Sequence, residues 1–133
     1  MLFLQAISNP KVRFESQFPK RIGAQGHCMD APLIVVNFKT YSSAMAGSAD
    51  KLGQLMAAVE TDARMVAVAS AFDLSSVSSI SGLEVWSQHL DPVGQGSHTG
   101  WLEPQTAIER GAAGTIINHA EHKVPLEHVR DLM

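Results

Sequence analysis

The sequence predicts an α/β protein built on a parallel β-sheet. Short apolar runs alternate with stretches in which apolar residues recur at the spacing of one helix face. Such strand–helix–strand units place neighbouring strands parallel, with right-handed crossovers. The four runs that we expect to form strands are residues 33–36, 65–69, 83–86 and 115–117.

The first strand and the helix after it have the clearest pattern. Residues 33–36 form an unbroken apolar run that ends at the polar Asn37, which is typical of a parallel strand buried on both faces. Residues 48–60 carry apolar side chains at spacings of 3, 4 and 7, so we expect a helix with Ser48 as its N-cap. These apolar positions are Leu52, Leu55, Met56 and Val59.

Three further helices are indicated by residues that start or stop a helix. A short helix covers residues 73–80 and opens at an aspartate. Another begins at Pro104 and is closed by Gly111, because proline suits the first helical turn and glycine the C-terminus. The last covers residues 125–132 and also opens at a proline.

Composition limits the range of functions. The chain has 133 residues, of which 45% are hydrophobic, and a formal net charge of −3. It can bury one core, and no excess of basic residues indicates nucleic acid or an anionic membrane surface. The apolar N-terminal run is too short for a membrane span or a signal peptide. A single cysteine, Cys28, cannot form an internal disulfide, so we expect a reducing, cytoplasmic location.

The first 28 residues differ from the rest in charge. Residues 1–28 hold four basic side chains and one acidic one, net +3, whereas residues 29–133 hold six basic and twelve acidic ones, net −6. The first segment shows no sustained period of 2 or 3.6. We expect a disordered extension or the product of an upstream translation start, with the domain beginning at Met29. A targeting or regulatory leader is the alternative.

Polar motifs follow the predicted strands. In parallel sheets the carboxyl ends of the strands share one edge, where sites are usually built. No glycine-rich phosphate loop follows the first strand, which argues against dinucleotide binding. The motifs are Asn37-Phe38-Lys39, Gln88-His89-Leu90-Asp91-Pro92, Gly96-Ser97-His98-Thr99-Gly100 and Asn118-His119-Ala120-Glu121.

Two of these motifs have a clear chemical use. Strand alternation would point Asn37 and Lys39 the same way, so that an amide and an ammonium converge on a small anionic ligand. His119 leaves a strand just before a helical turn, where backbone N–H groups and the helix dipole favour a neutral imidazole that can act as an electrophile. The simpler alternatives are a solvated lysine and a structural histidine.

In this order, the four motifs resemble those of triosephosphate isomerase, in particular its archaeal form. The resemblance covers about residues 33–133, roughly four of the eight β/α units of a TIM barrel. It implies that residues 29–133 are the N-terminal half of such a barrel. The implied reaction interconverts dihydroxyacetone phosphate and D-glyceraldehyde 3-phosphate through an enediolate, in glycolysis and gluconeogenesis, without a cofactor.

The resemblance assigns roles to individual residues. His119 matches the catalytic histidine that polarises the substrate carbonyl, for which triosephosphate isomerase is the usual example. Lys39 and Asn37 match the lysine and asparagine that bind the triose phosphate. Glu121 matches a supporting glutamate that keeps the lysine in place. Ala120 departs from the pattern, because the family usually has serine there.

The long loop at residues 88–100 implies assembly. In the family this loop enters the partner subunit, where its threonine approaches the active site, and Thr99 matches that threonine. Gln88 matches a glutamine that supports the interface. Long loops without secondary structure usually have a task, and docking into a symmetric partner is one. We expect a homo-oligomer, either a dimer or a tetramer.

Several parts of the family's machinery have no counterpart in this sequence. The family's catalytic base is a glutamate on the lid after strand six, and its phosphate grip lies in that lid and after strands seven and eight. We expect the isolated chain to be inactive, with exposed apolar edges at its first and fourth strands, unless a complementary C-terminal half completes it. The alternative is a non-catalytic half-barrel that serves as a binding or assembly module.

A metal site is the rival interpretation of the six histidines. His119 and His122 are three residues apart with Glu121 between them, and His89 with Asp91 follows a neighbouring strand. The sequence contains no His-x-His pair and no cysteine cluster, and the family needs no metal. We therefore expect none.

Overall fold

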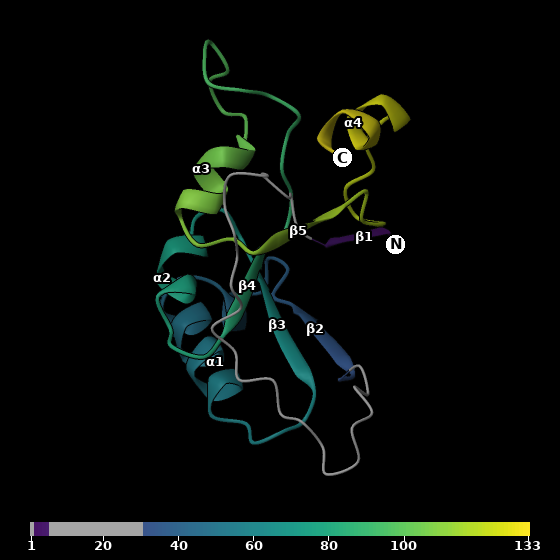
Figure 1. Ribbon diagram of the computed structural model, residues 1–133. Helices are drawn as coiled ribbons and strands as arrows, with labels where there is room; N and C mark the ends of the chain where they lie inside the picture. The colour runs from purple at the N-terminus through teal and green to yellow at the C-terminus, as the bar shows by residue number, and fades with distance from the viewer. Residues whose placement is uncertain (1, 6–30) are drawn as a thin grey trace.

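The computed structural model describes residues 2–5 and 31–133, which form a five-stranded sheet with helices packed on it (Figure 1). The strands, in the order β1-β5-β4-β3-β2, are β1 (Leu2–Gln5), β2 (Leu33–Asn37), β3 (Arg64–Ala69), β4 (Glu84–Ser87) and β5 (Gly114–Ile117). The helices are the 3-10 helix η1 (Ser42–Ala44), α1 (Gly47–Ala57), α2 (Leu74–Ser78), α3 (Pro104–Glu109) and α4 (Leu126–Leu132).

Strands β2 to β5 are parallel and lie side by side in chain order. Their register aligns Asn37, Val68, Trp86 and Gly114 in one row across the sheet. Helices α1, α2 and α3, each following a strand, lie on one side of the sheet (Figure 1). This arrangement confirms the predicted half-barrel, the first four β/α units of a TIM barrel.

Both faces of the sheet carry buried side chains. On the face that packs against the helices, Val85 and Ile117 belong to the main core together with Val77 of α2 and Val129 of α4. Each buried side chain of this size stabilises the fold by roughly 1.5–3 kcal/mol relative to an exposed one. A second buried cluster comes from strand residues of the opposite alternation: Val66, Val68, Trp86 and Ile116.

β2 is an edge strand, and its apolar side chains are only partly buried. Leu33 and Ile34 are 47% and 45% exposed. The prediction that this run is buried on both faces was therefore wrong, because the described sheet ends at β2 and nothing pairs with its outer side there. The predicted exposed apolar edge at this strand is confirmed.

β5 was expected to be the second exposed edge, and this prediction was wrong. β1 pairs with β5 in antiparallel orientation, with Leu2 opposite Ile117 and Gln5 opposite Gly114. β1 was not predicted because its apolar residues lie in the segment without a sustained period and were considered only as a membrane span or a signal peptide. The rest of the segment 1–28 lies outside the described residues, and so does Met29, so the predicted domain boundary stays a prediction.

Helix α1 begins without the predicted cap. Its N-cap is Ala46, and no side chain caps the helix. The Asp73 carboxylate, which is buried, instead accepts the backbone N–H of Ala46 at 3.1 Å and the Ser70 hydroxyl at 2.8 Å. The assignment of Ser48 as N-cap was wrong because a residue from the β3–α2 loop fixes the start of the helix.

The other helices begin close to the predicted positions. α3 starts at Pro104, and its N-cap Glu103 accepts the backbone N–H groups of Gln105 and Thr106 at 2.9 and 2.6 Å. These contacts satisfy two of the unpaired donors of the first turn. Among the helices of residues 31–133, none is long and apolar enough to cross a membrane.

Two glycines with positive φ allow a test of how closely α2 and α3 pack. Gly111 has φ +93°, and a Cβ atom there would lie 2.7 Å from the Ser78 Cβ atom, whereas Gly82 has φ +80° and open space around it. We expect Gly82→Ala to lower the free energy of unfolding by about 1–2 kcal/mol through backbone strain alone. Gly111→Ala should lower the free energy of unfolding by roughly 1–3 kcal/mol more than Gly82→Ala does, because the added methyl group overpacks against Ser78. Urea unfolding of both variants measures the difference, and equal losses would contradict the close packing.

Candidate active site

The C-terminal ends of β2, β4 and β5 bring predicted site residues together. The parallel ladder continues past the strand ends, since Phe38 N–H donates to the Val68 carbonyl at 3.0 Å and Gln88 N–H to the Ala69 carbonyl at 3.1 Å. The segments after the strands therefore start at the same edge of the sheet. Hydrogen bonds and ion pairs connect five of their residues, which we call the strand-end network: Asn37, Lys39, Gln88, His119 and Glu121.

Lys39 is positioned by a left-handed backbone turn. β2 ends at Asn37, and Lys39 has φ +53°, so the expected strand alternation of these two residues was wrong. Asn37 Oδ1 accepts the Lys39 N–H at 2.9 Å, while Gln88 Nε2 donates to the Lys39 carbonyl at 2.8 Å and to Asn37 Oδ1 at 3.3 Å. Since this conformation costs a non-glycine residue about 1–2 kcal/mol, these bonds hold a strained turn, as is common at functional sites.

The Lys39 ammonium forms an ion pair with Glu121. The distance from Nζ to Oε1 is 2.8 Å, and the two side chains are 33% and 59% exposed. The hydrogen bond to Glu121 raises the pKa of Lys39, and the same bond lowers the pKa of Glu121. Because both groups are open to solvent, the pair orients the ammonium more than it stabilises the fold.

His119 lies beside this ion pair with a defined tautomer. Its Nδ1 accepts the backbone N–H of Glu121 at 3.2 Å, so the ring proton lies on Nε2. The Glu121 carboxylate is farther from Nδ1, at 3.6 Å, and would pair with it only if the imidazole were charged. Because the contact of Nδ1 with the backbone N–H is shorter than its contact with the carboxylate, we assign the ring proton to Nε2. The predicted helical turn is a single β-turn closed by His122 N–H on the His119 carbonyl, so no helix dipole acts here.

Asn118 has a structural role that the sequence analysis missed. Its φ is +56°, and its Oδ1 accepts the backbone N–H of Val124 at 3.2 Å. The side chain thereby closes the loop that carries His119 and Glu121. Asparagine is one of the few residues that tolerate left-handed backbone, and an asparagine directly after a strand is the signal that could have indicated this turn.

Thr99 stays outside the strand-end network. It lies in the segment between β4 and α3, which extends away from the sheet (Figure 1). Thr99 is exposed and lines an open hollow with Asp91, Gly100 and Trp101. No network residue lines this hollow, and among the described residues no hydrogen bond joins Thr99 to the network. The assignment of Thr99 and Gln88 to a subunit interface stays a prediction.

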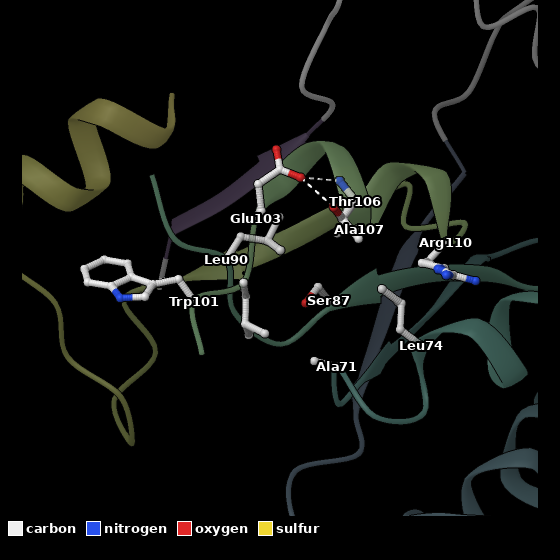
Figure 2. A pocket seen from close by; sticks show the side chains of 10 residues that line it. Ala71, Leu74, Ser87, Leu90, Trp101, Glu103, Thr106, Ala107 and Arg110 are labelled. Atoms are coloured by element: carbon white, nitrogen blue, oxygen red, sulfur yellow. Dashed lines mark hydrogen bonds between the residues drawn. The ribbon is translucent and has the colours of Figure 1, made fainter. Parts of the chain in front are cut away.

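A second hollow lies beneath α3 (Figure 2). Leu74, Leu90 and Leu102 contribute to its apolar lining, and the side chain of the helix cap Glu103 lies at its border. None of the five network residues lines it. This hollow is therefore separate from the candidate active site.

The family model for triosephosphate isomerase matches residues 32–132 of this chain. The chain belongs to the triosephosphate isomerase family. Among its relatives, the triosephosphate isomerase of Methanoculleus marisnigri is 36% identical over 106 residues, which cover 76% of this chain and 46% of that protein. The enzyme of Methanosarcina barkeri is 38% identical over 103 residues, again 76% of this chain and 46% of that protein. Both relatives are archaeal, as the motifs predicted.

The chain spans about half the length of the triosephosphate isomerases that it matches. A crystal structure of the Bartonella henselae triosephosphate isomerase superposes with a TM-score of 0.59 at 24% identity, over 68% of this chain and 38% of that one. This likeness supports the fold. The archaeal resemblance and the half-barrel are thus confirmed, while the roles of the five network residues stay predictions.

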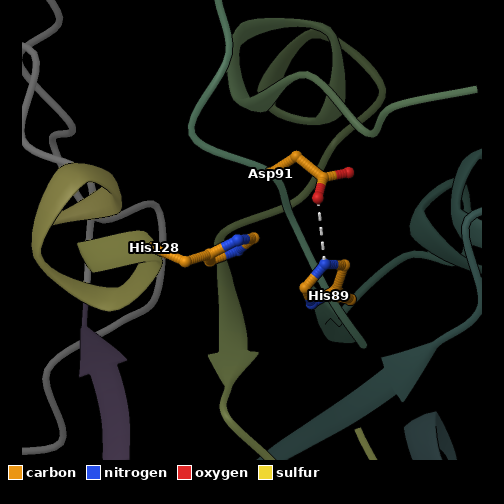
Figure 3. Close-up of side chains that lie close together, drawn as sticks. All are labelled: His89, Asp91 and His128. Carbon is orange, nitrogen blue, oxygen red and sulfur yellow. Dashed lines mark hydrogen bonds and ion pairs between the residues drawn. The ribbon is translucent and has the colours of Figure 1, made fainter. Parts of the chain in front are cut away.

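A different group of side chains has the composition of a metal site (Figure 3). One possible ligand atom from each of His89, Asp91 and His128 lies within 4.8 Å of the other two. Burial lowers the pKa of His89, against the opposing effect of its contact with Asp91. Of the residues in the rival metal interpretation, this group contains His89 and Asp91, whereas no such group within the described residues contains His119, His122 or Glu121.

The Lys39–Glu121 ion pair is tested by titrating Lys39. The pair's contribution to stability is present between the ordinary pKa values of 4.5 for Glu121 and 10.5 for Lys39. It is lost as pH falls through the lowered Glu121 pKa or rises through the raised Lys39 pKa. In Glu121→Gln, the Lys39 pKa measured by NMR should fall back toward 10.5. Glu127→Gln, which removes a carboxylate from α4, is the control, and an unchanged Lys39 pKa in Glu121→Gln would contradict the pairing.

Proposed function

We propose that this chain supplies the N-terminal half of a cytoplasmic triosephosphate isomerase. The reaction interconverts dihydroxyacetone phosphate and D-glyceraldehyde 3-phosphate by proton transfer, without a cofactor or metal. The observation that supports the proposal is the contact between Lys39, Glu121 and His119 in a member of this family. Lys39 follows β2, whereas His119 and Glu121 follow β5, and all three lie at the same edge of the sheet.

The network residues are suited to stabilise an enediolate. When a proton leaves the carbon next to the substrate carbonyl, negative charge grows on the carbonyl oxygen. The Nε2–H of His119 can donate to that oxygen, while the Lys39 ammonium offsets its charge and Asn37 fixes the lysine backbone. A preorganised donor aimed at such an oxygen typically lowers the barrier by roughly 2.7–4 kcal/mol.

The remaining groups belong to a second half. By family resemblance, the carbon-bound proton is taken by a glutamate on the lid loop after strand six, and the phosphate is held by backbone after strands seven and eight. The described residues correspond to the strands before these elements. We therefore propose that the isolated chain has no turnover and that a complementary C-terminal half is the partner that completes it.

Complementation tests this proposal. The purified chain is assayed for isomerase activity alone and after mixing with the C-terminal half of the Methanoculleus marisnigri enzyme. We expect activity only in the mixture, and His119→Ala in the mixture should lower it at least 100-fold, because the donor to the enediolate is lost. His122→Ala changes a histidine of the same turn that is outside the network, and it should leave the activity unchanged.

Two results would overturn the proposal. The first is normal turnover by the chain alone. The second is complemented activity that survives both His119→Ala and Lys39→Met.

The second candidate function is a non-catalytic module that assembles through the edge of β2. The exposed Leu33 and Ile34 favour it, because an apolar edge strand is a template for pairing with another chain. Sedimentation of the chain alone should then show a discrete homo-oligomer that Ile34→Lys converts to monomer. Leu55→Lys, at an exposed position of α1, should leave the oligomer intact. A wild-type chain that sediments only as monomer would reject this candidate.

A further inference from the structure

We propose that His89, Asp91 and His128 form a binding site for one divalent transition-metal ion of the zinc type. The three residues come from the segment after β4 and from helix α4, and none of them belongs to the strand-end network. The site therefore adds a ligand-binding property that does not depend on the proposed isomerase function.

His89 and Asp91 already have the spacing of two ligands on one ion. Nε2 of His89 lies 3.2 Å from Oδ1 of Asp91. Metal–ligand bonds of about 2.0–2.2 Å in tetrahedral zinc sites place neighbouring ligand atoms about 3.4 Å apart. An ion can thus take the place of the proton between these two atoms with little movement. A ring nitrogen of His128 lies within 4.8 Å of both, so a movement of this ring toward the other two ligands completes the set (Figure 3).

Two of the ligands are anchored through their other polar atom, as metal ligands in proteins usually are. Oδ2 of Asp91 accepts the backbone N–H of Leu102 at 2.7 Å, which leaves Oδ1 for the ion. Nε2 of His128 lies 2.9 Å from the carbonyl oxygen of Leu90. Because a carbonyl can only accept, Nε2 carries the ring proton and Nδ1 keeps the lone pair that binds a metal.

The surroundings of His89 restrict its ring further. The ring stacks on His122 at a centroid distance of 4.3 Å and on His128 at 5.2 Å. All three ligands are only partly exposed, so the side chains lose little freedom when they bind. Two imidazoles and one carboxylate favour zinc, cobalt, nickel or copper over magnesium and calcium. Three protein ligands also leave a fourth position for water or an anion.

The test is metal binding by the full chain prepared without a histidine tag. After treatment with a chelator, the protein is titrated with Co²⁺, whose visible absorption reports tetrahedral coordination, and Zn²⁺ is then added in competition. We expect one Co²⁺ per chain and its displacement by one Zn²⁺. Absence of stoichiometric binding, or a spectrum of octahedral Co²⁺ only, would overturn the proposal.

Matched variants locate the site. His128→Gln keeps an N–H donor for the Leu90 carbonyl but removes the imidazole, and it should weaken Zn²⁺ binding at least tenfold while the circular dichroism spectrum stays unchanged. His98→Gln removes a histidine of the β4–α3 loop that is outside the group, and binding should be unaffected. Equal affinity in His128→Gln and the wild type, or equal loss in His98→Gln, would show that the ion binds elsewhere.

Discussion

The parallel register of β2 to β5 is the constraint on which the other features depend. It fixes Asn37, Val68, Trp86 and Gly114 in one row, so the segments after the strands leave the sheet at the same edge. A slip of one residue in any strand would turn its side chains to the opposite face, and Trp86 would leave its buried cluster. The same slip would separate the groups that hold Lys39 in its left-handed turn.

Strands β2 to β5 and the four α-helices were predictable from sequence because their signals are local. Apolar runs identified β2 to β5, and prolines marked the beginning of the third and fourth helices, within a residue or two of their observed bounds. The N-terminus of α1 and the conformation of Lys39 were not predictable in this way. Each depends on a side chain from a later segment, Asp73 in the first case and Gln88 in the second.

For the candidate sites, too, local signals in the sequence identified residues but not the contacts between them. Motif matching selected the five network residues, but it could not give the reason why Lys39 and Glu121 meet, which is the turn at Lys39 and the loop closed by Asn118. His128 carries no motif at all. The packing of Val129 of α4 in the main core and the contact of His128 with the Leu90 carbonyl bring its ring to His89, and no spacing in the sequence encodes these contacts.

The antiparallel pairing of β1 with β5 has a consequence for barrel assembly. In an eight-stranded parallel barrel, the edge of β5 that β1 occupies would carry the next parallel strand. Two strands cannot share the same backbone donors and acceptors, so closing the barrel means exchanging one strand for another. β1 thus occupies the place on β5 where a TIM barrel has its next parallel strand. If a complementary half-barrel were to pair with this edge of β5, β1 would have to leave first, and at high concentrations of that half the release of β1 would limit the rate of assembly.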